Sequence, residues 1–192
     1  DAVRAMGESR EELRQLAADV LEPVLRSSGR SESLADVLEM RLRAQTEPSD
    51  RARTLRAIAE VAENQLGDAR RAQDALHRAL AEEPSDAELH AEIERVAEKN
   101  GDDGWSRYAT TLTERAGSIF DADVTTSLFV RLGKIAEEKL HDDARAVKAY
   151  AQVGENAGDS PEILAALDRL YSRLGDSRNL VDVLERRISA EA

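Results

Sequence analysis

An internal repeat constrains this chain of 192 residues more than any other feature. Three pairs of identical residues lie 74 positions apart: Leu66 and Leu140, Glu88 and Glu162, and Gly101 and Gly175. A further match joins residues 34–39 to residues 180–185, which lie 146 positions later, or about two periods. A period in this range indicates stacked supersecondary units, in which each unit packs mainly on its neighbours.

Each period contains several helices. Its apolar residues recur at helical spacing, as in Leu55, Ile58 and Val61, and Gly, Asp, Ser or Pro clusters interrupt them. Ala, Leu, Arg and Glu dominate the composition, and aromatic residues make up only 3% of it, which favours helices. We therefore predict an all-α fold of ten helices in five antiparallel hairpins, over approximately residues 8–45, 48–83, 85–117, 121–157 and 159–190.

Local signals refine these helices. Ser49-Asp50 and Ser85-Asp86 are predicted N-caps, because their side chains accept hydrogen bonds from the first free N–H groups of a helix. Pro23 lies inside the first helical pattern and is expected to kink it. The aromatic residues that fall on apolar stripes or directly after a turn are expected in the core: Trp105, Tyr108, Phe129 and Tyr150.

Two segments resemble the tetratricopeptide repeat family. In the first, a glycine turn precedes a small, a bulkier and another small residue, and then a proline: Gly67-Asp68, Ala72, Leu76, Ala79 and Pro84. The second runs from Leu132-Gly133 through Ala146, Tyr150 and Val153, but His141-Asp142-Asp143 replaces its Gly-Asp turn and is expected to add a residue. The resemblance implies a right-handed α-solenoid over residues 1–192 with a concave, protein-binding surface. The Lys and Asn set of the family's chaperone-tail-binding members is absent, so that role is not implied.

Charge and composition exclude several classes of partner. The net charge of −12 argues against nucleic acid or an anionic membrane as the main partner, because both attract basic surfaces. The chain has no cysteine, no apolar run of membrane-spanning length and no signal-peptide hydrophobic region. It opens at Asp1 directly into helical sequence, so we expect a fragment of a longer protein whose compartment stays open.

No pattern in the sequence predicts catalysis, and we expect neither a cofactor nor a bound metal. His77, His90 and His141 lie on different predicted helices or turns, and none has a second ligand three or four residues away. The glycine-containing segment 101–104 lacks a following Lys and a preceding strand, so it is a turn rather than a phosphate loop.

A partner-binding groove is predicted on the first helix of each hairpin, opposite its apolar stripe and at spacings of four residues. The positions are Arg56, Glu60 and Asn64; Ala91, Arg95 and Lys99; Val130, Lys134 and Glu138; and Ala165, Arg169 and Arg173. Six of these residues are basic and two are acidic, which favours a partner with acidic side chains or a free carboxylate. The alternative is that the arginines pair with glutamates on adjacent helices.

The sequence thus predicts a protein-interaction module or scaffold that binds a protein or peptide in its concave groove. Two alternatives stay open: an architectural spacer, and a regulatory or substrate-recruiting arm of a larger protein. A terminal hairpin without a capping repeat exposes apolar surface, so homo-oligomerisation through such a hairpin is a further alternative. The C-terminal helix ending at Ala192 is the expected contact.

Overall fold

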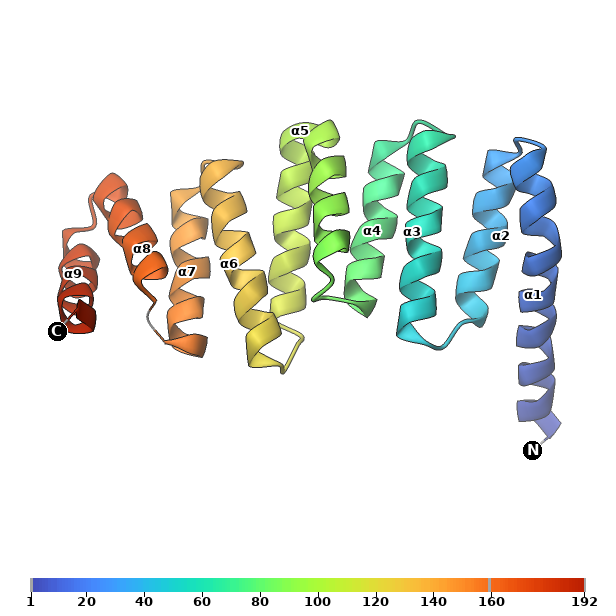
Figure 1. Cartoon of the computed structure of the whole chain (residues 1–192), viewed down its shortest axis with the longest axis horizontal. Helices are drawn as coiled ribbons and strands as arrows, with labels where there is room; N and C mark the ends of the chain where they lie inside the picture. The colour runs from blue at the N-terminus through green and yellow to red at the C-terminus, as the bar shows by residue number, and fades with distance from the viewer. Residues whose placement is uncertain (1, 159, 192) are drawn as a thin grey trace. The chain divides into compact units, whose positions relative to one another are not determined.

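A computed structural model describes residues 2–158 and 160–191, and this part of the chain is helical without a single strand. Figure 1 shows the order of the helices. Their bounds are α1 Ala2–Ser27, α2 Ser31–Ala44, α3 Pro48–Asn64, α4 Ala69–Glu82, α5 Ala87–Ala116, α6 Ala122–Glu138, α7 Asp143–Ala157, α8 Pro161–Leu174 and α9 Ser177–Glu191. The predicted all-α class is confirmed. Asp159, where the last predicted hairpin begins, and Ala192 lie outside the described residues.

The chain divides into two compact units, residues 1–100 and 101–192. In unit 1, α1 packs on α2, α2 on α3 and α3 on α4. In unit 2, α6 packs on α7, α7 on α8 and α8 on α9. The boundary falls at Gly101, where the backbone of α5 leaves helical geometry (φ 62°, ψ −145°), so α5 consists of two helical segments.

The repeat seen in the sequence is also a repeat of structure. Helix α3 covers residues 48–64 and α6 covers 122–138, which is a displacement of 74 positions at both ends. The starts of α4 and α7, and of α5 and α8, are displaced by the same number. Each residue of unit 1 in this range therefore has a counterpart in unit 2 that occupies the same place in its own hairpin.

A residue in the left-handed backbone region closes each turn between paired helices. Gly29, Gly67, Gly101 and Gly175 take φ angles between 62° and 68°, and His141 takes φ 51°. His141 is the counterpart of Gly67, so the turn before α7 contains no additional residue, contrary to the prediction. A residue with a Cβ is strained in this region, and His141 is exposed.

The hairpin cores are built from complementary small and large residues. In α4 the side chains of Ala72 and Ala79 are fully buried, and Leu76 is 2% exposed. Tyr150, the counterpart of Leu76, lies against Gly133, where an added Cβ would stand 2.6 Å from the Tyr150 ring carbon Cε1. The larger aromatic ring therefore fits in unit 2 because its neighbour has no side chain.

The aromatic core predictions hold for Trp105, Tyr108 and Tyr150, which are 7%, 0% and 4% exposed. The Lys139 ammonium lies 4.8 Å from the centroid of the Trp105 ring, close enough for a cation–π contact. Phe129 is only partly buried, at the edge of the core.

Helix caps explain several of the boundaries. The Asp86 carboxylate accepts hydrogen bonds from the amides of Glu88 and Leu89 at the start of α5, as predicted. The prediction for Ser49-Asp50 is wrong: α3 already begins at Pro48, after Glu47, which makes no side-chain cap. Proline fixes the backbone angle that a first helical residue needs. Helix α1 continues through Pro23 to Ser27, so this proline does not end it.

The first helix of unit 1 and the last helix of unit 2 keep apolar side chains exposed. In α1 these include Leu16, Val20 and Val24, and in α9 they include Leu184 and Ile188. No described helix combines the length and apolar character needed to cross a membrane.

Candidate partner-binding grooves

In unit 1 four of the six predicted groove positions line one cavity of about 550 Å³, and Ala91 and Lys99 lie outside its lining. Arg56, Glu60 and Asn64 reach it from α3, and Arg95 reaches it from α5. Residues four positions apart share a helix face, which is why their spacing alone could place the α3 residues together.

Glu63 lies between two of the predicted groove cations, Arg95 and Lys99, and pairs with both. Its carboxylate accepts hydrogen bonds from both terminal nitrogens of Arg95, at 2.5 and 2.6 Å, and from Lys99 Nζ at 2.5 Å. The Glu63 side chain is 9% exposed. Hydrogen bonds from Arg95, and then from Lys99, lower the pKa of Glu63 to about 2, so it stays ionised at neutral pH.

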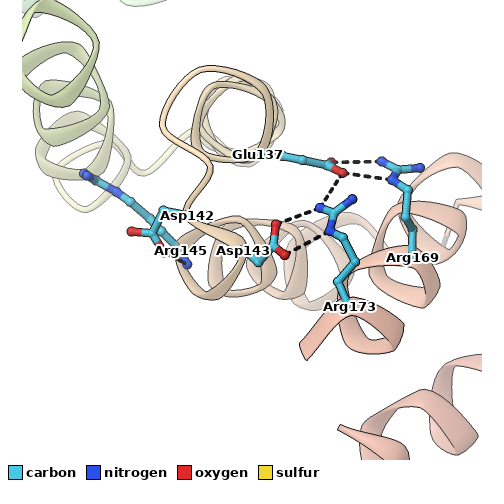
Figure 2. Close-up of polar contacts among 6 residues, drawn as sticks. All are labelled: Glu137, Asp142, Asp143, Arg145, Arg169 and Arg173. Carbon is cyan, nitrogen blue, oxygen red and sulfur yellow. Dashed lines mark hydrogen bonds and ion pairs between the residues drawn. The ribbon is translucent and has the colours of Figure 1, made fainter. Parts of the chain in front are cut away.

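The same arrangement recurs in unit 2, where Glu137 is the counterpart of Glu63. Figure 2 shows the Arg169 and Arg173 side chains converging on its carboxylate. Arg169 donates from Nε at 2.8 Å and from Nη2 at 2.9 Å, and Arg173 Nη2 donates to Glu137 at 2.8 Å. Arg173 also pairs with Asp143, at 2.7 and 2.9 Å. Arg169 and then Arg173 hold the pKa of Glu137 below its ordinary value.

These contacts correct the picture of a positively charged groove. Arg95, Lys99, Arg169 and Arg173 each pair with a glutamate on another helix, which is the alternative stated for the arginines from the sequence. Neither Glu63 nor Glu137 was among the predicted groove positions. The missing signal was the spacing: in each unit the glutamate precedes its two cations by 32 and 36 residues.

The two grooves differ most at Arg56 and its counterpart Val130. Arg56 donates to Asp86 at 3.2 Å and also pairs with Glu92, and this network fills the wall of the unit 1 groove. In unit 2 the counterparts of all three residues are uncharged, namely Val130, Ser160 and Ala166. The wall that carries these ion pairs in unit 1 is therefore uncharged in unit 2, with two apolar residues and one serine.

The resulting cavity in unit 2 has a volume of about 530 Å³. Its apolar lining includes Val130, Val153, Ile163 and Ala166, and its charged lining includes Lys134, Glu137, Glu138 and Arg169. Lys134 is exposed, and no ion pair joins it to another described residue. Burial raises the pKa of Tyr150, which also lines the cavity, to about 12, so its hydroxyl remains protonated.

The three histidines have different environments. His90 is buried, and its Nε2 lies 2.9 Å from the Pro84 carbonyl oxygen. Burial lowers the pKa of His77 to about 4, and His141 occupies an exposed turn. Within residues 2–158 and 160–191, no three His, Asp or Glu side chains are grouped so as to hold a metal ion.

Comparisons with known proteins identify no family. No family model matches the chain, and a search of curated proteins finds no match. Among solved structures, the chain is similar to one described as the crystal structure of MamA protein, with 13% identity, coverage of 93% of this chain and 92% of that one, and a TM-score of 0.47. It is also similar to one described as MamA MSR-1 C2, with 13% identity, coverage of 93% and 97%, and a TM-score of 0.45. Similarity at this level assigns neither a family nor a function.

Proposed function

We propose that this chain is a non-catalytic protein-interaction module that holds a partner peptide in the unit 2 groove. The observation that supports this proposal is the cavity of about 530 Å³ with an apolar lining and a charged rim. Such a cavity suits an apolar anchor side chain of a partner, and its rim suits the partner's polar groups. The resemblance to tetratricopeptide repeats agrees with this role, since that family binds proteins through such grooves.

An apolar anchor fits this groove better than an acidic one. A carboxylate entering the groove would compete with Glu137 for Arg169 and Arg173, whose hydrogen bonds are already formed. An aliphatic side chain needs no hydrogen bond from these arginines, and burying one stabilises the complex by roughly 1.5–3 kcal/mol. Lys134, on the rim, is available to orient the backbone or a polar side chain of the partner.

The test transplants the unit 1 network into unit 2 with the double variant Val130→Arg/Ala166→Glu. Its new side chains are the counterparts of Arg56 and Glu92, so they are expected to pair and to replace the apolar wall of the cavity by a charged one while the helices stay folded. Twelve-residue peptides would be selected on the unmodified chain by phage display, and their affinities for both proteins compared by fluorescence anisotropy. We expect peptides with a shared apolar residue to bind the double variant at least tenfold more weakly.

The matched control is Arg53→Glu, which changes an exposed residue lining the unit 1 cavity and is expected to leave peptide affinity unchanged. Circular dichroism establishes that each variant is helical. If no peptide is enriched, or if the double variant binds the selected peptides as well as the unmodified chain does, the proposal fails. The architectural spacer or the recruiting arm of a larger protein would then explain the array better.

Self-association through α9 is a second candidate, favoured by comparison with α2. Leu184 and Ile188 are 39% and 70% exposed, whereas Leu38 and Leu42, which lie 146 positions earlier on α2, are 1% and 3% exposed. Helix α2 packs against α3, so the equivalent face of α9 suits a further helix. The exposed stripe of α1 in a second copy would supply one. Sedimentation velocity should then show concentration-dependent association that Leu184→Glu/Ile188→Glu abolishes, and a monomer at all concentrations would reject this role.

A further inference from the structure

A second cavity of unit 2, of about 510 Å³, lies among α5, α6 and α7 and shares no lining residue with the groove cavity. Thr113 reaches it from α5, and Phe129 and Leu132 reach it from α6. The part contributed by α7 carries two cations, Arg145 and Lys148. Figure 2 shows Arg145 extending away from the Glu137 cluster, so it belongs to a different face of the unit.

The counterpart of this place in unit 1 is filled by ion pairs. Helix α2 presents three acidic residues there, Glu32, Asp36 and Glu39. Arg71 donates to Glu32 at 2.9 Å, and Arg78 donates to both oxygens of Glu39 at 2.6 and 3.1 Å. The Arg78 hydrogen bonds are the main cause that lowers the pKa of Glu39. In unit 1 the facing helices α2 and α4 thus satisfy each other's charges.

In unit 2 the three acids are replaced by hydroxyl residues, and one of their two arginine partners remains. Displacement by 74 positions takes Glu32, Asp36 and Glu39 to Ser106, Thr110 and Thr113. It takes Arg71 to Arg145, Asp74 to Lys148, and Arg78 to Gln152, which also lines the cavity. The Arg145 guanidinium contacts only the Thr113 hydroxyl, at 3.5 Å, and neither Arg145 nor Lys148 forms an ion pair with any residue that the structure describes.

The hydroxyls cannot replace the lost carboxylates. Thr113 donates its hydroxyl to the Ala109 carbonyl at 2.8 Å, and Thr110 donates to the Ser106 carbonyl at 3.0 Å, so both are engaged with their own helix. The cavity therefore combines two cations with the partly buried ring of Phe129 and the buried side chain of Leu132. Its one acidic lining residue, Asp142, caps α7 and accepts a hydrogen bond from the backbone amide of Arg145 at 2.9 Å. Apolar surroundings strengthen the attraction between a cation and an incoming anion relative to open water.

We infer that this cavity binds a carboxylate of a partner polypeptide, either an acidic side chain or a terminal carboxylate, in the place that Glu32 and Glu39 occupy in unit 1. The guanidinium of Arg145 offers two parallel N–H donors to such a group, and Lys148 adds a point charge. The inference rests on the proposed function only in taking the ligand to be a polypeptide, because the cavity is separate from the apolar groove. It moves the acidic partner predicted from the sequence away from Arg95 and Arg169, which are already paired.

The test uses an array of twelve-residue peptides, each printed in two forms. One form carries Asp, Glu and a free C-terminus, and the other carries Asn, Gln and a C-terminal amide. The affinities of the best binding pairs would be measured by fluorescence anisotropy. We expect the carboxylate form to bind the unmodified chain at least tenfold more tightly than the amide form. This ratio of the two affinities should fall as salt is added.

Two variants locate the carboxylate contact. Arg145→Gln/Lys148→Gln removes the cations, and Ser106→Glu/Thr113→Glu restores acids at the places of Glu32 and Glu39. All four residues lie at least partly exposed on helix surfaces, so the fold should persist. Both variants are expected to reduce the ratio between the two peptide forms to near one, and Val130→Arg/Ala166→Glu should leave that ratio unchanged.

The outcomes separate this inference from the proposed function. A ratio near one on the unmodified chain, or a ratio that survives Arg145→Gln/Lys148→Gln, overturns the carboxylate site even where peptides bind the apolar groove. Loss of the ratio in both cavity variants, together with full affinity in Val130→Arg/Ala166→Glu, supports the carboxylate site and rejects the apolar groove.

Discussion

Replacing Glu63 by Gln should destabilise the chain in a pH-dependent way. Glu63 has a pKa of about 2 in the folded chain against an ordinary value of 4.5, a difference that corresponds to roughly 3.4 kcal/mol. Its partners Arg95 and Lys99 are each 53% exposed, so solvent screening reduces the expected contribution to about 1–2 kcal/mol. At pH 7, Glu63→Gln should lower the free energy of unfolding by that amount.

The sign of the pH dependence follows from the lowered pKa. The unfolded chain takes up the proton near pH 4.5 and the folded chain only near pH 2, so the stability due to the ionised group is present above about pH 5 and is lost as the pH falls toward 2. The assay is urea unfolding followed by circular dichroism at several pH values. The difference between the unmodified chain and Glu63→Gln should shrink steadily between pH 5 and pH 2.

The control for this experiment is Glu60→Gln, on the same helix and exposed, which should change the unfolding free energy by less than about 0.5 kcal/mol. Comparing the variants as differences removes the effect of the other carboxylates of this acidic chain. Equal stability of Glu63→Gln and the unmodified chain at pH 7, or a difference that stays constant down to pH 3, would refute the reasoning about the Glu63 cluster.

Three further predictions concern single residues. His141→Gly should raise the free energy of unfolding by about 1 kcal/mol because it relieves the positive φ; urea unfolding followed by fluorescence of Trp105, the only tryptophan, measures this, and a loss of stability would contradict it. Gly133→Ala should cost about 1–3 kcal/mol through the clash with the Tyr150 ring, and the same assay should show partial rescue by Tyr150→Leu. His77 should titrate near pH 4 in an NMR titration of its imidazole signals, and a midpoint above pH 6 would contradict its burial. Because the unfolded chain binds this proton already near pH 6.5, the folded chain should lose stability as the pH falls from 6.5 to 4.

The fold could be predicted from the sequence because its signals are local and repeated. Apolar spacing marked the helices, and glycines marked most of the turns between paired helices. The sequence was misleading at the turn before α7, where His141 takes a backbone conformation that glycine normally supplies. It was also misleading at α3, where Pro48 begins the helix before the predicted Ser49-Asp50 cap.

The groove was only partly predictable, because ion pairing joins residues on different helices. Helical spacing placed Arg56, Glu60 and Asn64 on one face, but nothing local reveals that Glu63 receives both Arg95 and Lys99 from another helix. Counting charges on one face therefore overestimated the positive charge of the groove. The repeat itself contained the missing information, since the same glutamate and cation spacings occur again around Glu137.

Comparing each residue with its counterpart in the other unit separates structural roles from binding roles. Glu63 and Glu137 make equivalent contacts in the two units. We therefore assign these contacts to the packing of the helices and not to the binding of a ligand. Arg56 and Val130 differ, as do Glu39 and Thr113, and at each of these places unit 1 satisfies its own charges. Unit 2 has lost a set of charges at both places, so its groove cavity has an apolar wall where the unit 1 cavity has the paired Arg56 and Glu92. At the second place it has a cavity with two cations that form no ion pair with any described residue. An interaction role for this chain is therefore expected to depend on unit 2, and variants at the corresponding positions of unit 1 should affect stability without affecting partner affinity.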